Sequence, residues 1–212
     1  MSRLHGVRMF ALALLFGACS NVEADPRLFD ETDYFALDGS VRAWTFAAAE
    51  GGLDWTLGIE KTGAVAEDDY EIVTLTYGDA DSGAGLWQVR WSDDPIRGVR
   101  IFGTTDLESG LVTDFSTPVV LLQRTPQAEP VVSRTDAGTF TAGAARYDGC
   151  ETFWEPAWGD EQCLVVTLTG DGSGEHAILT GEYRLVPSVG LAWLALDAWP
   201  DTWWLSDFDW VE

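Results

Sequence analysis

The side chains that could do chemistry in this chain are few, and their spacing matches no familiar catalytic set. His176 is the only histidine beyond residue 18, and a lone histidine is more often structural than catalytic. No G-x-S-x-G nucleophile elbow is present. A glycan hydrolase that uses two carboxylates needs only acids about 5–10 Å apart, so the 35 acidic residues leave that alternative open without selecting a pair. The pattern favours a protein that is not an enzyme.

Two glycine-rich segments place carboxylates at alternate positions, a spacing that can wrap a calcium ion. They are Asp79-Ala80-Asp81-Ser82-Gly83 and Asp171-Gly172-Ser173-Gly174-Glu175. Calcium takes about six to eight oxygen ligands, which makes the candidate metal ligands Asp79, Asp81, Asp171 and Glu175. Neither segment fits an EF-hand loop, and ordinary hairpin turns have the same composition. The sequence therefore requires no cofactor, and calcium is the one metal to test.

Tryptophan is the unusual residue, with eleven in the chain. A tryptophan buries a large apolar area, and on an exposed strand face its ring can also stack on a ligand. In the last segment Trp204, Phe208 and Trp210 are expected to share one strand face, while Trp154 and Trp158 lie between the two late cysteines. These five residues are the candidate surface for an apolar, glycan or protein ligand. The alternative is that the rings fill the inside of a curved sheet.

Cys150 and Cys163 are predicted to form a disulfide. If the chain is exported and Cys19 is modified, as the first residues imply below, these two cysteines form an even pair in an oxidising compartment. Closing a loop of this size contributes roughly 3 kcal/mol. Two buried free thiols, or half of a metal site, are the alternatives.

The elements that must position these residues are strands. Leu53, Trp55, Leu57 and Ile59 alternate with polar or small residues, a period of two that indicates a half-buried strand. The same reading predicts strands at Val41–Ala48, Tyr70–Tyr77, Leu86–Ser92, Gly98–Thr104, Pro118–Gln123, Val131–Arg134, Thr139–Tyr147, Gln162–Thr169, Ala177–Val186, Leu191–Asp197 and Thr202–Val211. Glycine-rich turns separate them, so we expect an all-β fold, either an antiparallel sandwich or a curved, partly closed sheet (half-barrel) of about 10–12 short strands.

The charge of the chain is strongly acidic. There are 12 basic and 35 acidic residues, for a formal net charge of −23 at pH 7. Nucleic-acid-binding domains need a basic patch to neutralise phosphates, so no nucleic-acid partner is expected. An acidic domain face is also repelled by anionic lipid.

The first eighteen residues have the features of a secretory signal. Arg3 and Arg8 give a positive start, and the apolar run Met9–Phe16 is far shorter than the roughly twenty residues that span a bilayer. Leu15-Phe16-Gly17-Ala18-Cys19 resembles the lipobox of bacterial lipoproteins. The resemblance implies cleavage before Cys19, lipid attachment to its sulfur and a place in the cell envelope. Lipoproteins that are retained in the inner membrane carry aspartate directly after the lipidated cysteine. This chain has Ser20 there, which implies transport to an outer membrane.

Two further segments resemble envelope lipoproteins of this kind. They are Tyr34–Phe46, which has an aromatic pair, a turn glycine and a Trp-Thr-aromatic triplet, and the turn Pro187-Ser188-Val189-Gly190-Leu191. The chain departs from the pattern at Ala36, often a proline there, and at Ala43. The resemblance implies an antiparallel β domain and no particular activity.

The chain is therefore expected to have three parts: a signal peptide over 1–18, a lipidated cysteine with a short tether over 19–33, and one β domain over 34–212. We expect a membrane-anchored envelope lipoprotein that is not an enzyme and binds a ligand through an aromatic β surface. A structural or assembly lipoprotein without a small-molecule ligand is one alternative, and the acid-based glycan hydrolase is the other.

Overall fold

The computed structural model describes residues 41–49, 55–67, 70–94, 97–123, 129–147, 163–171, 176–186 and 189–210. The described chain forms strands β1 (Val41–Ala48), β2 (Leu57–Ala66), β3 (Glu71–Asp79), β4 (Ala84–Asp94), β5 (Gly98–Asp106), β6 (Val112–Leu122), β7 (Val131–Thr135), β8 (Gly138–Tyr147), β9 (Cys163–Gly170), β10 (Gly181–Val186), β11 (Gly190–Leu196) and β12 (Trp203–Trp210). None of the described residues belongs to a helix long and apolar enough to cross a membrane.

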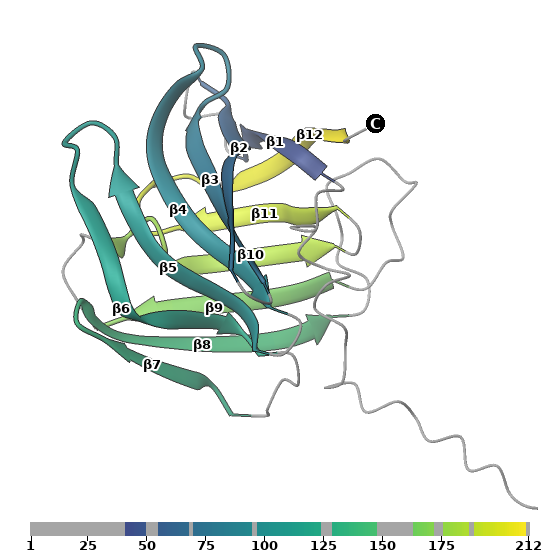
Figure 1. The fold of residues 1–212 in the computed structure, drawn as a ribbon. Coiled ribbons are helices and arrows are strands. Elements are labelled where there is room, and N and C mark those ends of the chain that lie inside the picture. The colour runs from purple at the N-terminus through teal and green to yellow at the C-terminus, as the bar shows by residue number, and fades with distance from the viewer. Residues whose placement is uncertain are drawn as a thin grey trace, which may run out of the picture.

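All twelve strands belong to one antiparallel sheet in the order β6-β5-β4-β3-β2-β1-β12-β11-β10-β9-β8-β7. Apart from β6 and β7, strands that are consecutive in the chain are paired, and the ladder between β1 and β12 joins the two halves. Figure 1 shows β2–β5 passing in front of β8–β11, so that the sheet curls into a nearly closed, barrel-like shape. The prediction of an all-β, curved and partly closed sheet is confirmed.

Strands β6 and β7 are the two edges of this sheet, and side chains join them. The hydroxyl oxygen of Ser133 accepts the backbone N–H of Val120 at 2.9 Å. The carboxylate of Asp136 accepts both the backbone N–H and the hydroxyl of Ser116, at 3.1 and 3.0 Å. These side-chain oxygens satisfy edge amides that would otherwise be open to another strand.

The inside of the sheet is filled by large side chains. Trp44, Trp91 and Trp203 are each no more than 1% exposed, and Tyr77 and Tyr183 are buried with them. Burial raises the pKa of both tyrosine hydroxyls, because the interior disfavours the phenolate. Trp91 and Tyr183 meet edge on across the sheet, with ring centroids 6.1 Å apart. For these three tryptophans the core alternative is correct.

A bulge in β12 reverses which residues face the interior. Leu205 lies opposite Phe46 and Asp207 lies opposite Thr45, so the ladder shifts at Ser206. Before the shift Trp204 lies on the outside, opposite the exposed Ala47. After it Phe208 lies opposite Trp44 and packs against the core. The expectation that Trp204 and Phe208 share a face is therefore wrong, because an extra residue breaks the period of two. The side chain of Trp210, expected on the same face, lies outside the described part of the chain.

Candidate functional site

The carboxylates predicted to bind calcium at 79–81 are used by the β3–β4 hairpin itself. Asp79 accepts the backbone N–H of Asp81 at 3.0 Å and the hydroxyl of Ser82. Asp81 in turn accepts the hydroxyl of Thr56 at 3.1 Å. The bonds from Ser82, and then from Asp81, hold the pKa of Asp79 below its usual value. These contacts are those of a side-chain-capped turn.

The same turn occurs a second time, between β5 and β6. Residues 79–83 read D-A-D-S-G and residues 106–110 read D-L-E-S-G. Asp106 accepts the backbone N–H of Glu108 at 2.9 Å and the hydroxyl of Ser109 at 2.7 Å, and the closing glycines Gly83 and Gly110 have φ of 72° and 73°. The repeat was visible in the sequence as D-x-[D/E]-S-G, and it identifies a turn motif.

The second predicted calcium segment is only partly described. Asp171 accepts the backbone N–H of Thr139 at 2.9 Å, which ties the end of β9 to β8. Glu175 lies outside the described residues. Asp171 follows β9, whereas Asp79 ends β3 and Asp81 lies in the turn after it. The sheet order therefore does not bring the two segments together. Within the described ranges no group of three or more histidine, cysteine, aspartate or glutamate side chains could hold a metal ion.

Four capping carboxylates are expected to make the fold sensitive to acid. Hydrogen bonds lower the pKa of Asp79, Asp106, Asp136 and Asp171, and the main donors are Ser82, Ser109, Ser116 and Thr139 respectively. A lowered folded-state pKa adds stability above the unfolded value of about 3.9, and that stability is lost as pH falls through the folded value. We therefore expect the free energy of unfolding, measured by urea titration from pH 7 to pH 2, to fall below about pH 4.

The variant Asp79→Asn/Asp106→Asn keeps an acceptor oxygen in each turn and removes the charge. It should unfold more easily at pH 7 and show a shallower loss of stability in acid. A pH profile parallel to that of the unaltered protein would contradict the assignment of acid sensitivity to these turns.

His176 has the surroundings of a structural histidine. It is 7% exposed, and its ring centroid lies 5.7 Å from that of Phe115 and 5.6 Å from that of Phe140. Phe115 belongs to the edge strand β6 and Phe140 to β8, so the imidazole packs beneath the contact between the sheet edges.

Several predicted site residues fall outside the described part of the chain. These are Cys19, Cys150, Trp154 and Trp158. Cys163 is described, begins β9 and is 1% exposed. The lipid site, the disulfide and the pair of tryptophans at 154 and 158 stay predictions.

An aromatic row crosses the outer face of β10, β11 and β12. Trp204 lies directly opposite Trp193 in the β11–β12 ladder, and Trp193 lies opposite Arg184 in the β10–β11 ladder. The guanidinium carbon of Arg184 is 4.2 Å from the centroid of the Trp193 ring, and Glu182 accepts from Arg184 Nε at 2.9 Å. Both tryptophans are half-buried. We call Arg184, Trp193 and Trp204 the outer aromatic row. Of these three residues, only Trp204 is predicted from the sequence as a candidate ligand-binding residue.

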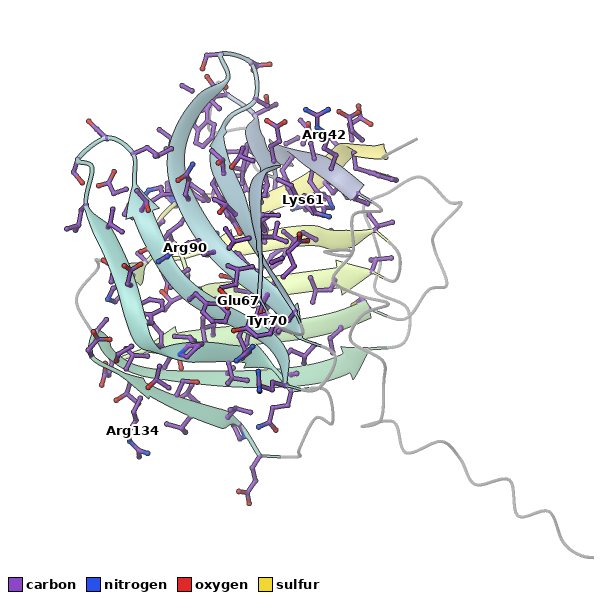
Figure 2. The ribbon with its side chains drawn as sticks, in the orientation of Figure 1. Arg42, Lys61, Glu67, Tyr70, Arg90 and Arg134 are labelled. Atoms are coloured by element: carbon purple, nitrogen blue, oxygen red, sulfur yellow. The ribbon has the colours of Figure 1, made fainter. Side chains whose placement is uncertain are left out.

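A second outer cluster lies at the β2–β3 turn, where Figure 2 labels Tyr70 beside Glu67. The rings of Tyr70 and Phe102 are stacked with centroids 6.1 Å apart. The guanidinium of Arg100 lies 4.8 Å from the Tyr70 ring centroid and 5.1 Å from that of Phe102. An arginine therefore lies against aromatic rings here, as Arg184 does against Trp193.

Next to the outer aromatic row, the outer face of β1–β3 is hollowed. The hollow has a volume of about 360 Å³. The register explains it, because Thr45, Gly58, Gly78 and Gly85 lie side by side on four strands and three of them carry no side chain. A side chain at Gly78 would overlap the carbonyl oxygen of Ala84, so the hairpin itself requires this glycine.

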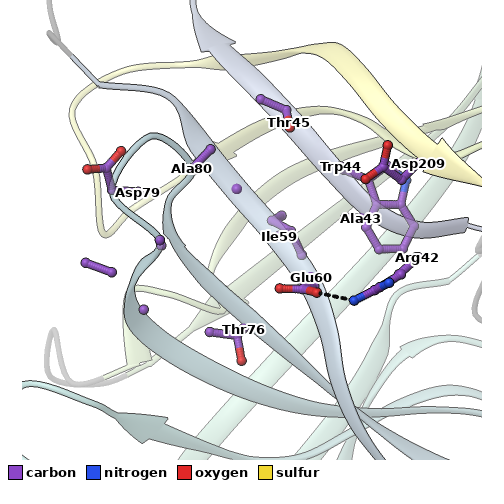
Figure 3. A pocket seen from close by; sticks show the side chains of 15 residues that line it. Arg42, Ala43, Trp44, Thr45, Ile59, Glu60, Thr76, Asp79, Ala80 and Asp209 are labelled. Carbon is purple, nitrogen blue, oxygen red and sulfur yellow. Dashed lines mark hydrogen bonds and ion pairs between the residues drawn. The ribbon is translucent and has the colours of Figure 1, made fainter.

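Charged side chains surround this hollow (Figure 3). The carboxylate of Glu60 on β2 accepts a hydrogen bond from the guanidinium of Arg42 on β1, with Nη2 and Oε1 3.2 Å apart. Both side chains are at least half exposed. Asp79 and Asp209 complete the charged lining, with the hydroxyl-bearing Thr76 beside them. The hollow therefore has three carboxylates, and its single guanidinium is already paired with one of them.

Comparisons of the chain with protein-family models, with curated proteins and with solved structures give no match.

Proposed function

We propose that the protein is a lipid-anchored protein of the bacterial cell envelope that performs no catalysis and binds a ligand on the outer face of its β domain. The observation that carries the proposal is the outer aromatic row. Trp193 and Trp204 keep part of their surface open on the outside of the sheet, whereas Trp44, Trp91 and Trp203 are used inside it. Adjacent outward-facing tryptophans present a rigid apolar area, as binding surfaces commonly do.

The location rests on the lipobox-like segment ending at Cys19 and on the predicted disulfide between Cys150 and Cys163. A lipid on Cys19 would attach the domain to a bilayer through the segment that leads to the start of β1. Because β1 and β12 are antiparallel, with Val41 opposite Trp210, the C-terminal end of β12 lies at the same end of the sheet. The D-x-[D/E]-S-G turns close the β3–β4 and β5–β6 hairpins at the opposite end, directed away from the anchor.

A structural or assembly lipoprotein is the second candidate. It is favoured by the filled interior, in which the largest rings serve packing. The two candidates differ in one respect, which is whether the outer tryptophans are open to solvent.

Quenching of tryptophan fluorescence by acrylamide separates the two candidates. Acrylamide is uncharged, so the net charge of −23 does not repel it. We expect the variant Trp193→Phe/Trp204→Phe to lose a readily quenched part of the emission. Trp91→Phe, which removes a fully buried ring, is the control and should leave that part in place. Outer tryptophans as shielded as Trp91 would favour the structural candidate.

The anchor is tested separately by mass spectrometry of the protein purified from the membranes of a bacterial host. A mature chain beginning at Cys19 with added acyl mass is expected, and Cys19→Ser should release the domain into the soluble fraction. An intact, unmodified Met1 would overturn the anchored location.

A further inference from the structure

We infer that the outer aromatic row and the hollow on β1–β3 form one continuous site for a neutral oligosaccharide. This inference rests on the proposed function and narrows it, because it names both the extent of the binding surface and the chemistry of the ligand.

The two surfaces adjoin through β1. Trp204 lies opposite Ala47 in the β1–β12 ladder, and the next outward residue of β1 is Thr45, which lines the hollow. The hydroxyl of Ser206 donates to the carbonyl oxygen of Thr45 at 3.0 Å and holds the two strands together at this point. Ala47 is small and exposed, so no side chain of β1 separates the indole of Trp204 from the hollow.

The outer aromatic row fits the apolar face of a sugar ring. The C–H groups of a pyranose form a flat apolar surface that can lie on the indole of Trp204, while its hydroxyls remain at the rim. The guanidinium of Arg184 already lies against the ring of Trp193. Glu182 and Arg184 lie beside Trp193 on the same face, and they supply an acceptor and donors for those hydroxyls.

The charge of the hollow disfavours anionic and apolar ligands. An anionic ligand would meet Glu60, Asp79 and Asp209, and the one cation in the lining, Arg42, already pairs with Glu60. An apolar chain would desolvate these carboxylates without returning hydrogen bonds, which is costly. Hydroxyl groups can donate to carboxylates and accept from a guanidinium, so a neutral polyhydroxylated ligand satisfies the lining as it stands.

The dimensions are also consistent with a chain of sugar units. A volume of about 360 Å³ lies near the lower end of the roughly 300–1,000 Å³ usual for small-molecule sites. The hollow therefore accommodates one end of the ligand, and the flat outer aromatic row supports the units that follow.

The test is isothermal titration calorimetry of the unaltered protein with maltohexaose, cellohexaose and the uncharged hexamer of N-acetylglucosamine. We expect at least one to bind. Trp204→Ala should weaken that binding about tenfold, the effect of losing roughly 1.4 kcal/mol of ring contact. Glu60→Gln/Asp209→Asn should weaken it by a similar factor, because both substitutions lie on the exposed lining of the hollow. Glu67→Gln, an exposed acid at the β2–β3 turn, is the matched control and should not alter it.

The outcomes separate the inference from the proposed function. If Trp204→Ala weakens binding and Glu60→Gln/Asp209→Asn does not, the inference of one continuous site is wrong, while the proposal that the outer face binds a ligand stands. If hexalysine or palmitate binds with dependence on Trp204 and no neutral oligosaccharide does, the ligand class is wrong and the proposed function again stands. If no probe binds and acrylamide fails to reach Trp193 and Trp204, both are overturned.

Discussion

Replacing Trp44 by alanine should lower the free energy of unfolding by about 3–5 kcal/mol, the usual cost of removing a fully buried indole. Trp44 lies on β1, the strand that joins the two halves of the sheet, and packs beside Phe208 of β12. Its Nε1–H also donates to the carbonyl oxygen of Val189 at 2.6 Å, in the turn before β11. The substitution therefore leaves a cavity and a buried carbonyl without its donor.

Two further variants divide this effect into its parts. Trp44→Phe keeps most of the apolar area and removes the N–H, so we expect a loss of about 1–3 kcal/mol from the unsatisfied carbonyl. Trp193→Ala removes a half-buried tryptophan from the outer face and should cost less than Trp44→Ala. Urea unfolding followed by circular dichroism measures all three. Equal losses for Trp44→Ala and Trp193→Ala would contradict the assignment of Trp44 to the core.

Replacing Gly181 by alanine should destabilise the protein by about 3 kcal/mol or more, a large effect for one added methyl group. Gly181 begins β10 with φ of 136°, a conformation that residues with a side chain rarely adopt. A Cβ there would overlap the carbonyl oxygen of Ala195 on β11. Gly181 also pairs with both Leu196 and Leu168, so relief of the overlap would disturb three strands.

Two other glycines are matched controls for Gly181. Gly83 has φ of 72° with nothing within 4 Å of a Cβ, so Gly83→Ala should cost only about 1 kcal/mol of backbone strain. Gly143 has neither a positive φ nor a close neighbour, and Gly143→Ala should be nearly neutral. If Gly181→Ala is no worse than Gly83→Ala, then the overlap with β11 is relieved without cost.

The strands themselves could be predicted from local patterns because burial alternates along most of them. Thr139–Tyr147 was expected and β8 runs from Gly138 to Tyr147. The first half of β6 was missed, because Val112–Thr117 is mostly exposed and does not alternate in hydrophobicity. The strand expected from Ala177 begins only at Gly181, since the carbonyl oxygen of His176 accepts the N–H groups of Leu179 and Thr180 and forms a turn there.

The candidate site was less predictable because it depends on register between strands. Trp204 could be identified as a candidate from composition, but its neighbours Trp193 and Arg184 are set by pairing across three strands. The hollow likewise requires Gly58, Gly78 and Gly85 to align from three strands. The bulge at Ser206 has no local sequence signal that distinguishes it from a regular strand. Sequence alone could not separate calcium ligands from turn caps, since aspartates at alternate positions in a glycine-rich segment suit both.

The ladder between β1 and β12 has a consequence for the order of folding. Every other ladder joins consecutive strands, so β1–β6 and β7–β12 can each assemble from local hairpins. The ladder that unites them spans the domain: Ser206 bonds to Thr45 across 161 residues of chain, and such distant contacts form slowly. Until the last strand is available, β1 has an open edge next to Trp44 and Phe46, a template for aggregation. If the chain is exported from its N-terminus, the domain cannot complete its sheet until β12 has crossed.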